Sequence, residues 1–153
     1  MKHLFILMLD VGLLFTGCNS SKKAVQRELK NLDTTSLSLS DANWKVIEIN
    51  GAPITSTMKR KPFLKFSEDN KVSGFAGCNG FGGTYTLKNT STISIDNVIS
   101  TKMACPDLAI ENNLFRVFEN TNNFIVKGDT LFFNDAAMNS IAKFVASSAD
   151  SLQ

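Results

Sequence analysis

Residues 74–85 of the chain read GFAGCNGFGGTY, and this stretch guides the interpretation of everything around it. It holds five of the nine glycines and one of the three cysteines. Glycine accepts positive φ values and allows another backbone to approach closely. We therefore expect a turn or a bulge at residues 80–83, which redirects the chain toward Tyr85. An anion-binding loop is the alternative, but the segment lies between expected strands and lacks the Lys-Ser/Thr pair of a phosphate loop.

Short segments rich in apolar and β-branched residues lie on both sides of this stretch. Such segments are typical of β-strands, and Asn50-Gly51 and Gly128-Asp129 are turn signals between them. The expected strands are residues 44–49, 62–66, 72–78, 84–87, 93–98, 124–126, 131–133 and 141–145. They predict an antiparallel sheet of about seven short strands.

The pattern changes to a helical period after residue 105. Ile110, Leu114, Val117 and Phe118 recur at helical spacing and predict one amphipathic helix over residues 106–120. The fold class is therefore mainly β (α+β): a small, partly open, barrel-like antiparallel sheet with one packed α-helix. Ten phenylalanines from residue 41 on are enough to fill the core of such a domain.

The N-terminus has the pattern of a secretory signal. Residues 1–17 combine a positive start, an apolar run too short to span a bilayer and small residues before Cys18. The four residues 15–18 resemble a bacterial lipobox, which implies lipidation of Cys18 and a membrane partner. Asp10 inside the apolar run and Phe15 depart from that pattern, so an uncleaved or non-lipidated leader is the alternative.

The rest of the chain divides into three parts. Residues 18–40 are polar and are expected to form a tether, which a short helix is able to stiffen. Residues 41–146 form the domain, and residues 147–153 a tail. Basic and acidic residues number eleven each from Asp41 on, so the domain is formally neutral. Such a domain has no field to hold a phosphate backbone, and we expect a monomer that binds no nucleic acid.

Two motifs stand out together in the sequence. The first is Gly77-Cys78-Asn79, and the second is residues 100–105, STKMAC, with Thr101, Met103 and Cys105. Together they resemble the motifs of the META domain, the HslJ-like family of bacterial envelope proteins, and Glu111 matches a further family position. The resemblance covers residues 41–145. It implies a small β-rich, barrel-like domain with one helix and an association with heat, envelope or drug stress. It brings no catalytic residue and no cofactor.

Cys78 and Cys105 are the two cysteines that remain if Cys18 carries lipid. An even pair in an oxidising compartment favours a disulfide, and two buried thiols or a redox-active pair are the alternatives. Glu111 lies near the expected start of the helix, where negative charge is favourable, and we expect it to have a structural role.

Few residues in the sequence have the chemistry of catalysis or metal binding. The only histidine is His3, so the chain beyond the leader has no imidazole for acid–base work or for a zinc site. The carboxylates Glu68 and Asp69, in an expected turn, and Asp107, Glu111 and Glu119, on the expected helix, are expected to be solvated rather than catalytic. The run Lys59-Arg60-Lys61 is either a solvated loop or a contact for anionic lipid or a cell-wall polymer.

These observations favour a non-enzymatic lipoprotein of the cell envelope, anchored in the outer membrane and facing the periplasm. We expect it to bind or scaffold another envelope protein. A carrier of a small apolar ligand and an inhibitor presenting the loop at residues 52–61 are the alternatives. A carrier needs a cavity of about 300 Å3 or more, whereas a scaffold has a filled core.

Overall fold

A computed structural model of the protein describes residues 37–55, 60–106 and 108–147. The expected leader, Cys18 and most of the tether lie outside the described residues, as do Lys59, Asp107 and residues 148–153. The described elements are η1 (Leu39–Asp41), β1 (Asn43–Ile49), β2 (Ala52–Pro53), β3 (Phe63–Ser67), β4 (Lys71–Phe75), β5 (Gly80–Leu87), β6 (Ile93–Ser100), α2 (Ala109–Asn120), β7 (Asn123–Lys127), β8 (Thr130–Asn134) and β9 (Ser140–Ser147).

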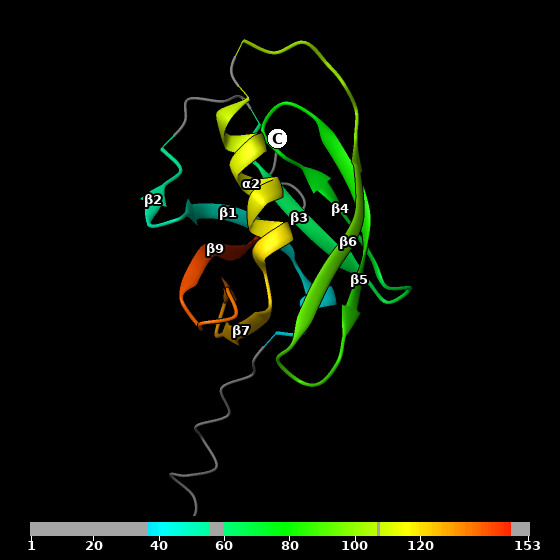
Figure 1. Ribbon diagram of the computed structural model, residues 1–153, viewed down its shortest axis with the longest axis vertical. Coiled ribbons are helices and arrows are strands. Elements are labelled where there is room, and N and C mark those ends of the chain that lie inside the picture. Colours follow the sequence, from blue (N-terminus) through cyan, green and yellow to red (C-terminus); the bar gives the residue numbers. More distant parts are fainter. Residues whose placement is uncertain (1–36, 56–59, 107, 148–153) are drawn as a thin grey trace, which may run out of the picture. The chain divides into compact units, whose positions relative to one another are not determined.

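The nine strands of the described residues form one antiparallel sheet in the order β6-β5-β4-β3-β1-β9-β8-β7, with the short β2 paired to β1. The two edge strands, β6 and β7, approach each other at one end through a bridge between Thr92 and Asn123. Helix α2 links these edges and lies across the remaining gap (Figure 1). The sheet is thus a curled, open half-barrel with one packed helix, as the sequence predicts.

Alternation of apolar and polar residues explains which face of the sheet is buried. In β1 and β3, Trp44, Leu64 and Phe66 point inward and are completely buried, while their neighbours reach the other face. Phe133 stacks edge-to-face on Phe66 and on Phe144, with ring centroids 6.4 Å and 4.8 Å apart. Aromatic side chains therefore fill much of the interior of the half-barrel.

Residues 37–40 pack on the domain, although the sequence analysis places them in the tether. Leu39 is buried, and its carbonyl oxygen accepts a hydrogen bond of 2.8 Å from the Trp44 indole nitrogen. A buried indole N–H needs such an acceptor. The domain therefore includes residues before Asp41. At the other end, β9 extends to Ser147, the first residue of the predicted tail.

The glycine-rich stretch turns earlier than predicted. Strand β4 ends at Phe75, and residues 76–79 form the turn, with a 2.8 Å hydrogen bond from the Ala76 amide to the Asn79 carbonyl. Gly77 supplies the positive φ of 114° that this turn requires. The predicted turn at residues 80–83 is wrong because this segment already pairs as β5.

The predicted bulge is present beside this segment. The register between β5 and β6 shifts between Gly82 and Thr84, so that Asn97 and Val98 of β6 face Gly83. Asn97 has a φ of 54°, and a Cβ on Gly83 would lie only 3.0 Å from the Asp96 carbonyl oxygen. Glycine at position 83 therefore allows the bulged strand to pack closely.

The helix begins later than predicted. Leu108 has φ −113° and ψ 8° and is the N-cap, so regular helical geometry starts at Ala109 rather than at Pro106. The buried face carries Glu111, Leu114, Val117 and Phe118, which agrees with the predicted amphipathic spacing except for the buried acid.

Candidate functional site

The residues of the two sequence motifs gather at one corner of the half-barrel, which we call the motif corner. It is formed by the turn at residues 76–79, the loop that follows β6 and the first turn of α2. Its members are Gly77, Cys78, Asn79, Thr101, Met103, Cys105 and Glu111.

The side chain of Asn79 is the hub of the motif corner. Its Oδ1 atom accepts two hydrogen bonds of 2.8 Å, one from the Thr101 hydroxyl and one from the Met103 amide. Its Nδ2 atom donates to Oε1 of Glu111 at 2.9 Å. One buried amide therefore joins the turn, the loop after β6 and the helix.

Glu111 is the buried acid of this network. Its side chain is only 6% exposed, and its Oε2 atom accepts a 2.8 Å hydrogen bond from the backbone amide of Asn79. A carboxylate removed from water needs such donors, and its place in the first turn of α2 is favourable for negative charge. Glu111 thus fixes the start of the helix against the turn at residues 76–79.

A disulfide joins Cys78 to Cys105 at the same corner, as the sequence predicts. Cys78 is buried beside the hub residue Asn79, and Cys105 lies in the loop before α2. The bond closes a loop over a sequence separation of 27 and holds the loop after β6 against the β4–β5 turn. The thiols of both cysteines are therefore consumed in a cross-link.

The contacts of the motif corner hold the turn at residues 76–79, the loop after β6 and helix α2 together. Its polar groups bond to one another, and the described residues contain no buried side-chain nitrogen or oxygen without a partner. The described part of the chain also holds no cluster of three or more potential metal ligands. Asp69 is away from this corner, in an ion pair with the exposed Lys71.

The described residues form three surface hollows that are binding candidates, and the sequence does not predict the first of them. This outer groove has a volume of about 560 Å3 and lies on the outer face of β3, β4, β5 and β6. Gly80 and Gly82 form its floor, because both face outward on β5 and carry no side chain. Strand register, which the sequence alone does not give, brings Phe63 and Ile99 to its two sides.

The outer groove is apolar at its walls and basic at its rim. Ile99 is 75% exposed, and the Arg60 guanidinium lies over the rings of Phe63 and Phe75, 5.2 Å and 4.7 Å from their centroids. Lys65 lines the groove directly. Arg60 belongs to the basic run of the sequence, and the structure places it on this outer face.

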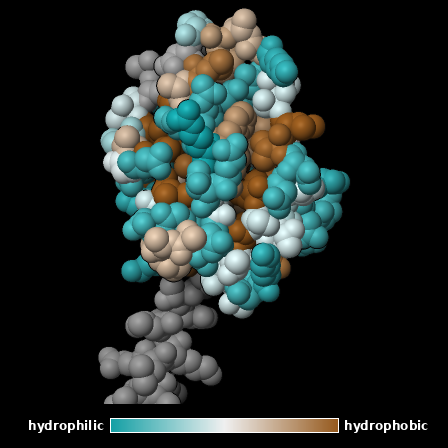
Figure 2. Space-filling view, in the orientation of Figure 1, coloured by the Kyte–Doolittle hydropathy of each residue, from teal (hydrophilic) through white to brown (hydrophobic). Residues whose placement is uncertain are grey.

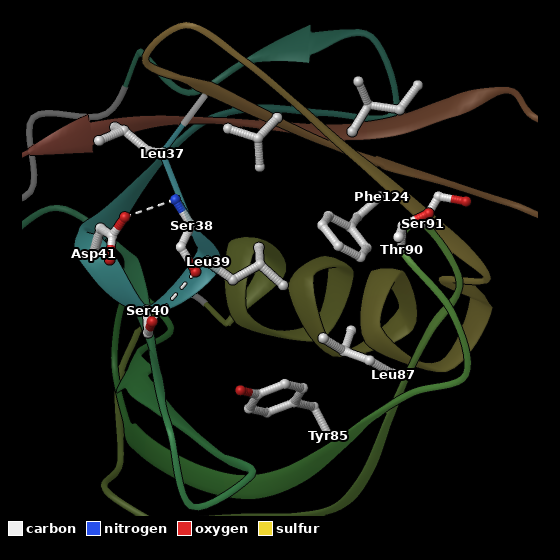
Figure 3. Close-up of a pocket in the computed structure, with 12 residues that line it drawn as sticks. Leu37, Ser38, Leu39, Ser40, Asp41, Tyr85, Leu87, Thr90, Ser91 and Phe124 are labelled. Atoms are coloured by element: carbon white, nitrogen blue, oxygen red, sulfur yellow. Dashed lines mark hydrogen bonds between the residues drawn. The ribbon is translucent and has the colours of Figure 1, made fainter. Parts of the chain in front are cut away.

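The second hollow is a mouth pocket of about 610 Å3 at the end of the half-barrel (Figure 3). Side chains of Leu39, Tyr85, Leu87 and Phe124 point into it, and Ser38, Asp41 and Ser91 lie at its rim. Burial raises the pKa of the Tyr85 phenol, with smaller contributions from Asp69 and Glu68, so the hydroxyl stays protonated and donates to the Ser67 carbonyl. Leu39 and Tyr85 belong to the buried core, so this pocket lies directly against it.

The third hollow is a side groove of about 500 Å3 between α2 and the edge strand β6. In Figure 2, a line of hydrophobic surface separates the hydrophilic surface over α2 from that over β6. Phe115 and Phe118 line it, together with Val98 and the acids Asp96 and Glu119.

The half-barrel and the motif corner define a small, mainly antiparallel β domain whose open side is covered by one helix. The chain belongs to the META domain family, whose model matches residues 35–148. Solved structures share the fold. A protein with an NMR structure is 23% identical, with a TM-score of 0.57 over 75% of this chain and 95% of that chain. No functionally curated protein matches the chain.

Two further solved proteins have the same fold at lower identity. A DUF4847 family protein from Bacteroides vulgatus is 15% identical, with a TM-score of 0.55 over 71% of this chain and 94% of that chain. A protein from Burkholderia xenovorans is 18% identical, with a TM-score of 0.56 over 94% of this chain and 99% of that chain. Among the described residues, no helix is long and apolar enough to cross a membrane.

Proposed function

We propose that this META domain protein is a non-enzymatic binding module of the bacterial cell envelope, anchored by lipid at Cys18, that recognises its partner through the outer groove. The proposal rests on a difference between the motif corner and the outer groove. The motif corner uses its polar groups internally, whereas the outer groove leaves apolar side chains and cations open to solvent. An exposed apolar patch with a polar rim is typical of an interaction site.

The envelope location draws on two features of the chain. Residues 15–18 resemble a lipobox, and a structural disulfide is typical of oxidising compartments outside the cytosol. Acyl chains on Cys18 would hold the domain at a membrane, with the outer membrane facing the periplasm as the proposed site. A tethered binding module is compatible with the stress association that the family resemblance implies.

Replacing Cys18 with serine should move the protein from the membrane fraction to the soluble fraction. Each buried methylene of an acyl chain contributes about 0.8 kcal/mol to membrane binding, so loss of the chains removes the anchor. Fractionation of cells followed by immunoblotting measures the effect, and Ser20→Ala is the control. A variant without Cys18 that stays as membrane-bound as the wild type would exclude the lipid anchor.

A photo-crosslinking residue at Ile99 should join the protein to its partner in intact cells. Met138 is the matched control position, because it is 57% exposed and apolar but lies in the turn before β9. We expect a discrete adduct from Ile99 and none above background from Met138. Equal labelling from the two positions would exclude the outer groove as the binding site, whatever the class of partner.

A carrier of a small apolar ligand is the second candidate, and the mouth pocket favours it. Its volume of about 610 Å3 exceeds what a small ligand requires, and Leu39, Leu87 and Phe124 give it an apolar lining. The same crosslinking residue at Leu87, which is 45% exposed, separates the candidates. A small-molecule adduct from Leu87 without an adduct from Ile99 would favour the carrier.

A further inference from the structure

Two glycines at the floor of the outer groove are not required by the fold. A Cβ on Gly82 would meet no atom within 4 Å, and a Cβ on Gly80 would meet only the Gly74 carbonyl oxygen, at an ordinary 3.7 Å. Neither residue has a positive φ. The other glycines that the structure describes differ: a Cβ on Gly74 would collide with backbone atoms and one on Gly83 would make tight backbone contacts, while Gly51, Gly77 and Gly128 have positive φ.

Glycine without a structural reason weakens a strand. It has no side chain to pack, and it loses more conformational freedom on folding than alanine does. Gly80 and Gly82 are outward-facing positions of β5, separated by the buried Phe81. A bare strand surface of this kind is typical of a place where a ligand or another backbone approaches closely.

The walls of the outer groove offer apolar contacts to such an occupant. Register across the sheet sets Phe75 of β4 beside Gly80, and Ser73 beside Gly82. Ile99 of β6 pairs with Gly82 on the opposite side and is 75% exposed. An apolar side chain placed over Gly82 would be covered from both sides, which is the usual setting of an interface anchor.

The charges beside the outer groove have one sign. Two cross-strand rows meet there, Lys45-Phe63-Phe75-Gly80 and Asn43-Lys65-Ser73-Gly82-Ile99, and neither contains an acid, whereas the next outward row, Ser67-Lys71-Thr84-Asp96, ends on one. Arg60 lies over the first row, and the exposed Lys102 follows β6. Lys45, Lys65, Arg60 and Lys102 are four of the eleven basic residues from Asp41 on. A partner segment with acidic residues would complement them.

The bare floor also indicates the class of partner. Lipid chains are fluid and would accommodate a methyl group on β5. Membrane binding therefore does not explain why positions 80 and 82 are both glycine. A polypeptide backbone has a fixed shape and gains contact when the floor carries no side chain. We propose that the outer groove receives an extended acidic segment of a partner protein, which places an apolar side chain over Gly80 and Gly82. This inference rests on the proposed function and names its partner.

The test selects ligands from a displayed library of short random peptides against the chain from Asn19 on, which retains the whole core. We expect enrichment of acidic peptides with a large apolar residue. Gly82→Val, which fills the floor, and Lys65→Glu, which reverses the rim charge, should each weaken the selected peptides about tenfold or more. Lys127→Glu, on the exposed end of β7, is the matched control and should leave binding unchanged.

Stability of the same variants separates binding from folding. Gly82→Ala should raise the folding equilibrium constant about twofold to fivefold, because alanine is better than glycine in a strand and its methyl has room. Urea unfolding measures it. A loss of stability would show that the fold itself needs Gly82 and would overturn the inference.

Two further outcomes would overturn the acidic peptide as the occupant. The first is selection of no peptides, or of peptides that bind Gly82→Val as well as the wild type. The second is binding of the protein to phosphatidylglycerol vesicles, measured by co-sedimentation, that is lost in the Gly82→Val and Lys65→Glu variants. That result would show that the groove binds anionic lipid. Either result leaves the proposed binding function standing if Ile99 still forms an adduct in cells, whereas loss of that adduct would exclude the function itself.

Discussion

Replacing Asn79 with alanine is expected to lower the free energy of unfolding by about 3 kcal/mol. The change removes the Nδ2 donor from the buried Glu111 carboxylate and the Oδ1 acceptor from the Thr101 hydroxyl and the Met103 amide. The carboxylate dominates the cost, because a buried charge that loses a donor cannot recover it from water. Urea unfolding followed by Trp44 fluorescence measures the change.

Asn120→Ala is the control for this experiment. Asn120 is exposed at the end of α2, and its Nδ2 atom donates to the Arg116 carbonyl. We expect its loss to change stability by about 0.5 kcal/mol or less. If the Asn79 variant loses no more than the Asn120 variant, the motif corner does not hold the helix against the turn.

Asn79→Asp sharpens the same prediction through its dependence on pH. The variant keeps the shape of the side chain but sets a second carboxylate against Oε1 of Glu111, where Nδ2 now lies at 2.9 Å. Like charges at this distance cannot both ionise cheaply, so one of the two should bind a proton at a raised pKa. The loss of stability should therefore be larger than for Asn79→Ala at neutral pH and should shrink as the pH falls. A loss independent of pH would contradict this account.

A double-mutant cycle isolates the contact itself. Glu111→Ala and Asn79→Ala should each destabilise the domain, while the double variant should lose less than the sum by about 1–3 kcal/mol. The coupling arises because each single change leaves a buried partner without its hydrogen bond. Additive losses would show that the two residues act independently.

The elements that the sequence predicts well are those determined by neighbours along the chain. Alternating burial gives β1 and β3 their inward side chains, such as Trp44 and Phe66, and helical spacing places Leu114 on the buried face of α2. These patterns depend only on the period of the element. The disulfide was predictable because only Cys78 and Cys105 remain in the domain.

The features that the sequence does not predict depend on contacts between distant residues. The glycines at positions 80–83 look like a turn, yet the turn forms at residues 76–79, where Glu111 accepts from the Asn79 amide 32 positions away. A cluster of glycines cannot show which member has the positive φ. The outer groove was missed for a related reason, because its walls at Phe63 and Ile99 come together only through the register of four strands.

Removal of the disulfide should lower the free energy of unfolding by about 3.5 kcal/mol, the value that chain entropy gives for a loop of this length. Replacing both Cys78 and Cys105 with alanine tests it by urea unfolding. Reductant should produce a similar loss in the wild type and no further loss in the double variant. Two reactive thiols in the unfolded wild type without reductant would contradict the disulfide.

The disulfide and the Asn79 network should not act independently, because Cys78 precedes Asn79 and both restrain the loop after β6. Reduction of the bond frees Cys105, so that the corner is able to open locally while the sheet stays folded. Asn79→Ala should therefore cost less in the reduced protein than in the oxidised one, with a difference of about 1 kcal/mol. Hydrogen exchange at the Met103 amide gives a second measure, since this amide should lose protection on reduction before the amides of β1 do. Equal costs and simultaneous exchange would show that the corner opens only when the whole domain unfolds.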